Sequence, residues 1–396
     1  MKKQFRLAIV AAALAAMTSC SDDNTNPTPD PDVRLQDQAY AAAKIVADGT
    51  GTGAVEDDLS FAVGLDYTSM AAPSTYDLVL TEGLLTDAQL SWSGNVSISG
   101  AIKVPAGKTL EIAAGTHIFA KNEGDQPSGA YLMVLKGAMI NAVGTADDMI
   151  VFTSELKAPG AWGGVLVNGA APINNGDANG EASPEVDSGV KYGGTNASDN
   201  SGTLSFVRVE YTGFKYNDES EHNGFTFSGV GSGTVLSNLQ AWKGTDDGLE
   251  WFGGTVNGTN LVSTGNEDDS FDWAHGFVGN LTNLKVEHDN SREFDKAFEI
   301  DNNSKNNSAE PYSNATVKNV TVMGVADETT AFRVREGAKG TFENLKVMNA
   351  KKGFDIHNDV TIQNVLDDAV VVSKYTVEDV AAESVVVYVD DCEDCE

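Results

Sequence analysis

The stretch TDDGLEWFGGTVNGTNLVSTGNEDDSFDWAHG, residues 245–276, nearly repeats itself after 22 residues. The aspartate pair at 246–247 returns at 268–269, and Trp251 returns as Trp273. Paired carboxylates occur in glycosidases, in calcium sites and on the solvated surfaces of repeat proteins. Because repetition at a short, nearly constant period indicates a solenoid, the fold has to be considered before the chemistry.

A strand-like register recurs six times in the second half of the chain, with apolar, polar and apolar residues in alternation. This alternation predicts a strand with one buried face. The first apolar positions are Phe225, Leu249, Phe271, Phe298, Phe332 and Phe354. The second apolar positions are Phe227, Trp251, Trp273, Ile300, Val334 and Ile356. The residues between them are Thr226, Glu250, Asp272, Glu299, Arg333 and Asp355.

An asparagine register follows each of these strands. Asparagine tolerates left-handed backbone at a bend, and its amide can hydrogen-bond to an identical amide stacked above it. Apolar ladders on both sides of such a bend fit coils of short strands that stack in parallel. The predicted fold class is therefore all-β, a right-handed parallel β-helix with a small N-terminal cap region. The asparagines are Asn238, Asn260, Asn283, Asn319, Asn344 and Asn364.

The coil pattern and the composition divide the chain into segments, since a solenoid needs terminal caps. Two polar insertions interrupt the coils, at 174–203 and 301–314. Such insertions often build the binding face of a solenoid. The predicted segments are a signal peptide at 1–19, a flexible tether at 20–32, an N-terminal cap region at 33–90, the β-helix at 91–372 and a C-terminal cap at 373–396.

The first residues resemble a bacterial lipoprotein signal. Basic residues precede a short apolar segment that ends in MTSC, residues 17–20. By this resemblance Cys20 becomes the lipid-bearing residue that anchors the protein to the outer membrane. The following SDDN resembles the export signal of Bacteroidota lipoproteins, which implies exposure on the cell surface. A lipoprotein that faces the periplasm is the alternative.

The chain is strongly acidic, with 58 acidic and 26 basic residues and a formal net charge of −32 at pH 7. Such a chain is repelled by nucleic acid and by anionic lipid, so we expect no nucleic-acid partner. Acidity suits cation binding but names no ligand. Cys392 and Cys395 close the chain as DCEDCE, and outside the cytoplasm they could form a small disulfide loop.

Four spaced motifs resemble a family of secreted or surface β-helix lipoproteins. They are GTADDMIVFTS at 144–154, WGGVLVNGAAPIN at 162–174, DDGLEWFGGTVN at 246–257 and DDSFDW at 268–273. They occur in the expected order and span residues 92–300 in outline. The resemblance implies a β-helix carried by a Bacteroidota surface lipoprotein. Some members carry a transporter label, which a sequence without predicted membrane spans does not support, so the resemblance implies no activity.

If equivalent strands stack about 4.8 Å apart, the repeated carboxylates form two columns. Like charges so close raise one another's pKa unless a cation or an arginine neutralises them. Calcium accepts oxygen ligands in flexible geometry, so a Ca²⁺ site is one interpretation and a solvated acidic column is the other. The predicted metal ligands are Asp246, Asp247, Asp268, Asp269 and Asp295, and the predicted binding column is Glu250, Asp272 and Glu299.

Catalysis is the alternative function. β-Helix polygalacturonases carry an Asp, an Asp pair, a His and a basic motif on successive coils, and this chain offers that order. The flanking residues depart from the pattern, because the histidine lies in VEHDN and not in a Gly-His-Gly turn. A repeating chain also produces such an order without catalysis. The candidate residues are Asp246, Asp268, Asp269, His288 and Arg333, and a calcium-dependent lyase would use Lys296 or Arg333 as its base.

The preferred interpretation is a non-enzymatic binding scaffold, with no catalytic residue assigned. A long solenoid offers an extended flank for a glycan or a partner protein. Trp242, in QAWKG, is the candidate for stacking on a sugar, and a position in the core is the alternative for this side chain. The resemblance to Bacteroidota lipoproteins implies an accessory role beside a TonB-dependent importer. A structural or adhesive surface protein is the remaining alternative.

Overall fold

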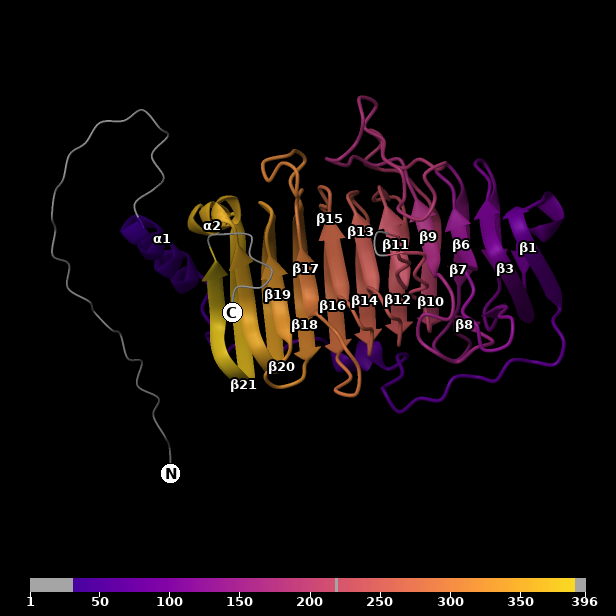
Figure 1. Ribbon diagram of the computed structural model, residues 1–396, viewed down its shortest axis with the longest axis horizontal. Helices are drawn as coiled ribbons and strands as arrows, with labels where there is room; N and C mark the ends of the chain where they lie inside the picture. Colours follow the sequence, from indigo (N-terminus) through magenta and orange to yellow (C-terminus); the bar gives the residue numbers. More distant parts are fainter. Residues whose placement is uncertain (1–30, 218–219, 389–396) are drawn as a thin grey trace.

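The computed structural model describes residues 31–217 and 220–388. Its strands stack into an elongated solenoid in which neighbouring coils pair in parallel (Figure 1). The all-β solenoid predicted from the repeats is confirmed. Across the described ranges, no helix is long and apolar enough to cross a membrane.

The element bounds follow the repeat. The first coils contain β1 (Leu78–Leu84), β2 (Ser91–Trp92), β3 (Asn95–Val104), β4 (Thr109–Ile112), β5 (His117–Ala120), β6 (Tyr131–Val134), β7 (Met139–Val143), β8 (Ile150–Ser154), β9 (Val165–Asn168) and β10 (Gly202–Glu210). The later coils contain β11 (Phe225–Ser228), β12 (Val235–Trp242), β13 (Leu249–Phe252), β14 (Asn257–Thr264), β15 (Phe271–Ala274), β16 (Asn280–Glu287), β17 (Lys296–Ile300), β18 (Asn314–Met323), β19 (Thr330–Val334), β20 (Lys339–His357) and β21 (Val370–Tyr388). The helices are α1 (Pro31–Lys44) and α2 (Asp359–Leu366), with short 3₁₀ turns η1 (Glu56–Leu59) and η2 (Asp87–Gln89).

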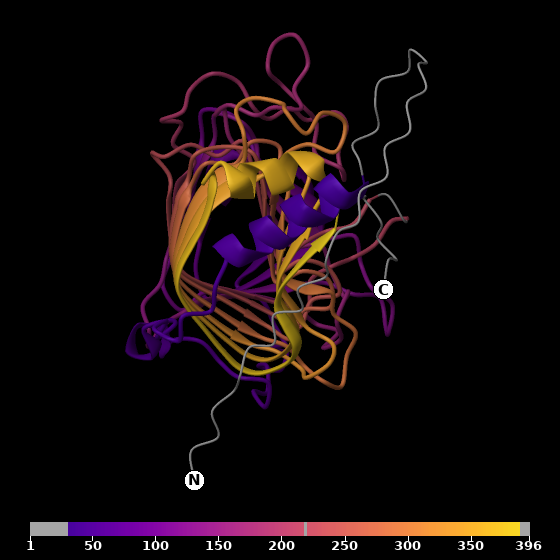
Figure 2. The same ribbon diagram turned by 90° about the vertical axis from the view of Figure 1, so that its left-hand side faces the viewer.

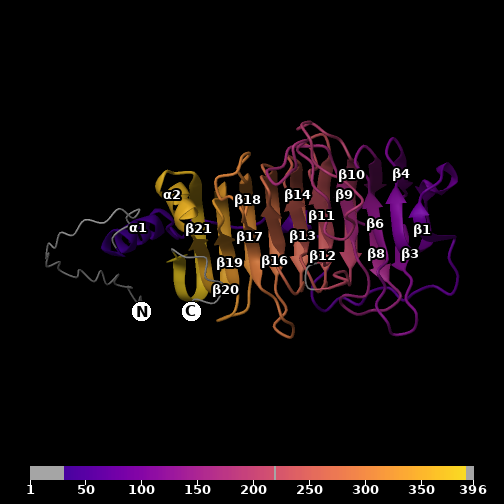
Figure 3. The ribbon, with the colours of Figure 1, turned by 45° about the horizontal axis from the view of Figure 1, so that its top comes forward.

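Each later coil combines one short strand with one long, bent strand. The short strands β9, β11, β13, β15, β17 and β19 pair in order and form what we call the short-strand sheet. The long strands β12, β14, β16 and β18 supply two further faces of the solenoid (Figure 3). β20 covers the same two faces and then joins the short-strand sheet, where its last residues pair with β19. In the earlier coils these two faces are separate strands, since β7 and β8 pair with the two halves of β10.

The bend of each long strand lies at an asparagine with left-handed backbone, φ between 54° and 65°, as predicted. The amides stack from coil to coil: Asn260 donates to Asn238 over 2.9 Å, and Asn283 donates to Asn260 over 2.8 Å. Asn344 donates to Asn319 in the same way, over 2.8 Å. The ladder therefore satisfies side-chain amides and holds the bends in register.

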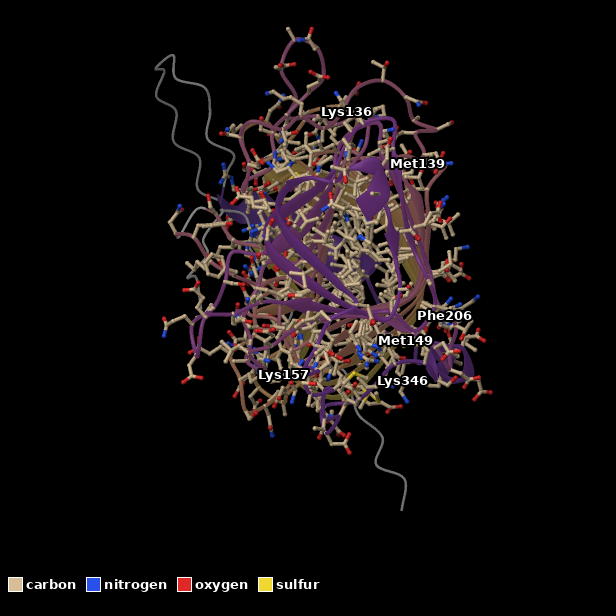
Figure 4. The ribbon with its side chains drawn as sticks, turned by 90° about the vertical axis from the view of Figure 1, so that its right-hand side faces the viewer. Lys136, Met139, Met149, Lys157, Phe206 and Lys346 are labelled. Atoms are coloured by element: carbon tan, nitrogen blue, oxygen red, sulfur yellow. The ribbon has the colours of Figure 1, made fainter. Side chains whose placement is uncertain are left out.

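The ladder ends differently from the prediction. Asn364 is not part of it, because Asn358 caps α2 by accepting a hydrogen bond from the Thr361 amide and the chain becomes helical there. Lys374 takes the bend position in the last coil, with φ 54°. At the other end Phe206 takes it in β10 and packs beside Met149, as Figure 4 shows.

The two predicted apolar ladders fill the interior, and all of their residues are fully buried. Phe271, Phe298, Phe332 and Phe354 form one continuous stack, with ring centroids 5.0, 4.7 and 4.6 Å apart. The end-on view of Figure 4 shows side chains filling the interior of the coils. Trp251 and Trp273 belong to this core, as predicted, so they are not ligand-binding residues.

The N-terminal helix lies at the opposite end from the one expected. α1 packs against α2 and β21 and crosses the last coil (Figure 2). Ala41 and Ile45 are buried in the main core at that end, and Lys44 donates to the Leu366 carbonyl. The prediction of an N-terminal cap at 33–90 is wrong in this respect, because the last coil carries an apolar end that α1 covers.

Residues 45–77, which we call the strap, run back along the solenoid to its first coil (Figure 1). The Thr52 amide donates to Asn344 over 2.7 Å, and the Val55 amide donates to Asn283 over 2.6 Å. Further along, the Tyr76 hydroxyl donates to Glu155 over 2.5 Å. The strap therefore contacts successive coils and covers part of the outer edge of the asparagine ladder.

The coils extend beyond the predicted bounds of 91–372. β1 already pairs in parallel with β3, so the solenoid begins inside the predicted N-terminal cap. β21 pairs with β20 as far as Tyr388, with one register shift between Ala350 and Lys352, and so extends into the predicted C-terminal cap at 373–396. Cys392 and Cys395 lie outside the described residues, as do Cys20 and the predicted signal peptide and most of the predicted tether.

Gly51 provides a test of strap docking, because a Cβ atom there would lie 2.1 Å from the Leu345 carbonyl oxygen and 2.3 Å from that of Lys374. We expect Gly51→Ala to lower the free energy of unfolding by about 1–3 kcal/mol, since the strap must move away from the coils. Urea unfolding measures the change. Gly64→Ala is the control, because its nearest neighbour would be 3.5 Å away. Equal losses in both variants would contradict close docking at Gly51.

Candidate metal centre

Three stacked loops carry the predicted aspartates, and each loop leads into a short strand. Asp247 precedes β13, Asp269 precedes β15 and Asp295 precedes β17. The loops are bonded to one another as well as stacked, because the Asp269 amide donates to Asp247 Oδ1 over 3.0 Å. In the next coil the Lys296 amide donates to Asp269 Oδ1 over 2.7 Å. The coil repeat thus places the loop carboxylates in a column.

A second carboxylate column lies on the outer side of the short-strand sheet. Glu250 pairs in register with Asp272, and Asp272 pairs with Glu299, as predicted. Arg333 follows in the same column. Since each loop aspartate lies only three or four residues before the column residue of its strand, the loop column and the strand column lie side by side.

The two columns meet in one pocket of about 230 Å³. Four of the five predicted metal ligands and the whole predicted binding column line it. The fifth predicted ligand, Asp295, groups with Asp268 and Asp269 at its edge. The pocket is lined by Glu185, Glu221, Asn223, Asp246, Asp247, Glu250, Asp268, Asp269, Asp272 and Glu299. What the sequence presented as two sets of candidates is a single site.

Three lining residues were missed by the sequence analysis. Glu185 comes from the polar insertion at 174–203, whose fold could not be inferred from the repeat. Asn223, whose amide donates to Glu250, and its neighbour Glu221 lie just before β11. A signal for Asn223 was present: in HNGFTFSG it occupies the register position of Asp247 and Asp269.

The carboxylates form four groups in which the ligand atoms lie within 4.8 Å of one another. Calcium–oxygen distances are about 2.3–2.6 Å, so oxygens on opposite sides of one ion are about 4.8 Å apart. The spacing therefore fits a metal ion. Neighbouring groups share one carboxylate each. The groups are Asp246–Asp247–Asp268, Asp247–Glu250–Asp272, Asp268–Asp269–Asp295 and Asp269–Asp272–Glu299.

The electrostatics of this pocket favour a positive ion. Burial raises the pKa of most of its carboxyl groups well above the ordinary value, and repulsion between neighbouring carboxylates raises it further. At the rim, burial and Asp295 raise the pKa of Asp268 to about 6. Asp272 Oδ1 is buried, and no residue in the described part of the chain donates a hydrogen bond to it. A cation would satisfy this oxygen and relieve the repulsion.

Two basic side chains border the pocket, and both are ion-paired. Lys296 pairs with Asp295 and lies 3.4 Å from Glu299, and Arg335 lies 3.1 Å from Glu299. Burial alone would lower the pKa of Lys296, but the surrounding carboxylates, Asp269 first, hold it above its usual range. Lys296 therefore keeps its proton, which does not suit the base role considered for it.

Three sequence candidates lie elsewhere. His288 Nδ1 is 2.9 Å from Thr329 Oγ1 and does not line the pocket. Arg333 lies 3.5 Å from Asp355 and is also absent from the lining. Trp242 is only 2 % exposed, because the strap covers it, so the prediction that it stacks on a sugar is wrong.

The raised pKa values predict an unusual pH dependence for the metal-free protein. A carboxyl group with a raised folded pKa binds more protons in the folded state, so stability falls as pH rises from the unfolded value, about 4, through the folded value. We expect the urea midpoint, measured in chelator, to decrease as the pH is raised from about 4.5 to about 7.5. Asp268, with a pKa of about 6, titrates inside this window. Added Ca²⁺ should make the urea midpoint less dependent on pH. A midpoint that rises with pH in chelator would contradict the raised pKa values of these carboxyl groups.

The fold and the site together define a parallel β-helix protein with an acidic pocket on its short-strand sheet. Residues 83–393 match the pectate-lyase-like beta helix domain, so the chain belongs to that family. Searches of curated proteins and of solved structures found no match. The β-helix expected from the four spaced motifs is therefore confirmed, whereas membership of a Bacteroidota lipoprotein family stays a prediction.

Proposed function

We propose that this chain is a calcium-binding β-helix that captures a polysaccharide. The observation that carries the proposal is the pocket lined by nine carboxylates and one amide. Membership of a pectate-lyase-like family supports a polysaccharide ligand. The repeated coils offer a flank along which an extended chain can lie.

The donor set supports Ca²⁺ over softer metals. Carboxylate and amide oxygens suit calcium, magnesium and manganese, whereas imidazole and thiolate ligands select zinc, copper and iron. Magnesium demands near-ideal octahedral geometry, while calcium tolerates an irregular cage with more oxygens. A pocket in which neighbouring groups share carboxylates on successive coils suits the irregular, oxygen-rich coordination of calcium. When bound, Ca²⁺ supplies open coordination positions to sugar hydroxyl or carboxylate oxygens.

Two arrangements favour binding over cleavage. An inverting hydrolase places its two carboxyl groups about 6.5–9.5 Å apart. The ligand oxygens of Asp246 and Asp268 lie within 4.8 Å of each other, so this pair is too close for the inverting mechanism that polygalacturonase-like cleavage would use. A lyase needs a side chain that accepts a proton, and the neighbouring Lys296 is held protonated by its carboxylate partners. Polysaccharide cleavage is the second candidate, favoured by the family match.

A polysaccharide panel tests the proposal. The full chain is passed over immobilised neutral and acidic polysaccharides with CaCl₂ or with chelator, and released reducing ends and unsaturated products are measured in parallel. We expect retention that requires calcium and is lost in Asp269→Asn, without product. Glu343→Gln, on a half-buried carboxylate outside the pocket that pairs with Lys318 and Lys374, is the matched control and should be retained like the wild type. Product formation would establish cleavage, and calcium-independent retention would overturn the proposal.

We further propose that the protein is a surface lipoprotein anchored through Cys20, as an accessory subunit of a TonB-dependent importer. The lipobox-like MTSC and the following SDDN support this location. Labelling with a radioactive fatty acid in cells, compared between wild type and Cys20→Ala, tests the anchor. Protease treatment of intact cells distinguishes the outer surface from the periplasm.

Co-purification from solubilised outer membranes tests the importer role, and recovery of the protein without a TonB-dependent channel would contradict that role.

A further inference from the structure

We propose that the strap positions the calcium ligands, so that the N-terminal segment controls the affinity of the pocket. This inference rests on the calcium site proposed above. The loops that carry the aspartate pairs begin beneath residues 63–67 of the strap. Contacts at the start of each loop therefore determine where its carboxylates lie, although no strap residue lines the pocket.

The strap holds the start of the first loop directly. Trp242 Nε1 donates to the Gly64 carbonyl over 3.1 Å, and Lys243 Nζ donates to the Leu65 carbonyl over 2.9 Å. The Tyr67 ring packs edge-on against Trp242, with centroids 5.3 Å apart. Lys243 has left-handed backbone, φ 55°, and it lies three residues before Asp246. The strap thus fixes the corner from which the first aspartate pair projects.

The second loop starts at the equivalent corner. Gly265 also has left-handed backbone, φ 64°, and lies three residues before Asp268. A Cβ atom on Gly265 would be 3.0 Å from Leu65 Cδ2, so the strap side chain closely approaches this backbone. The same strap residue therefore contacts both corners, one through its carbonyl oxygen and one through its side chain.

Hydrogen bonds join the loops into one stack. The Gly244 amide donates to Asn266 over 2.7 Å, and the Glu267 amide donates to the Gly244 carbonyl over 3.2 Å. From the third loop, Arg292 donates to the same carbonyl over 2.8 Å and to Glu267 over 2.5 Å. A shift of the first corner away from the strap therefore moves the carboxylates of all three loops.

Residues that orient metal ligands without touching the ion typically contribute about 10- to 100-fold to the metal affinity. We therefore expect the double variant Trp242→Phe with Lys243→Met to bind Ca²⁺ about tenfold more weakly, measured by isothermal titration of the full chain with CaCl₂. It removes two strap hydrogen bonds, keeps an aromatic ring at position 242 and keeps an apolar side chain of similar length at position 243. Lys243→Met alone serves if the double variant does not fold.

The matched control removes two strap hydrogen bonds away from the pocket. Thr321 Oγ1 accepts from the Ala54 amide over 2.9 Å, and Thr376 Oγ1 donates to the Gly51 carbonyl over 2.8 Å. The double variant Thr321→Val with Thr376→Val should lower the melting temperature, as Trp242→Phe with Lys243→Met does, but leave the calcium affinity unchanged. Equal calcium affinities of these two double variants would overturn positioning by the strap. A wild-type chain that takes up no calcium would instead overturn the proposed function, so the two failures are distinguishable.

Discussion

Replacing Asp269 with Asn is expected to weaken calcium binding by at least about 100-fold. Losing a residue that only orients a metal ligand costs up to about 100-fold, and Asp269 is a proposed ligand itself. Asp269 is only 2 % exposed and belongs to two of the four carboxylate groups. Asparagine has the same shape and can still accept the hydrogen bond from the Lys296 amide. The loss would therefore report the missing charge and not a rearranged loop.

The same substitution has the opposite effect on the metal-free protein. Burial and neighbouring carboxylates raise the pKa of Asp269, so its ionised form destabilises the folded state at neutral pH. Asp269→Asn should therefore raise the urea midpoint in chelator while it lowers the midpoint gain from calcium. Asp367→Asn, an exposed change near the solenoid end, should alter neither quantity. A variant that loses stability in chelator, or binds calcium like the wild type, contradicts the metal centre.

Replacing Phe298 with Ala is expected to lower the free energy of unfolding by about 3–5 kcal/mol. Phe298 is fully buried, and its ring lies between Phe271 and Phe332 in the aromatic stack. A cavity at this point also separates the rings above and below it. Urea unfolding measures the loss.

A smaller change on the same strand supplies the graded control. Ile300→Val removes one methyl group from a fully buried side chain and should cost about 1 kcal/mol. Both variants keep Glu299, the pocket residue between them. If Phe298→Ala costs no more than Ile300→Val, the aromatic stack does not hold the coils together as described.

Much of the fold could be predicted because each coil contacts mainly its neighbours. The alternation at Phe271, Asp272 and Trp273 determined which side chain is buried and which faces out, and the period determined the register. The asparagine bends followed from the same repeat. Asn364 failed as a ladder residue because local capping by Asn358 made the chain helical, and a register pattern does not detect that competition.

The candidate site was predicted in part. The repeat placed Asp247 beside Asp269 and Glu250 beside Asp272, since these positions recur with the coil. The repeat could not show which other side chains complete the pocket or which candidates stay away from it. Glu185 arrives from an insertion, and Trp242 is removed from the surface by the strap. The spacing of residues within a coil does not indicate where the insertion or the strap will lie.

The sequence by itself determined the strand period, the buried ladders and the two columns of carboxylates, because these features depend on contacts between adjacent repeats. Only the tertiary structure decided where the non-repeating segments lie. α1 covers the last coil and the strap contacts successive coils, and these contacts join residues far apart in the chain, such as Thr52 and Asn344. Such contacts form where an apolar end or an unpaired amide is left exposed by the finished solenoid, so no local pattern specifies them.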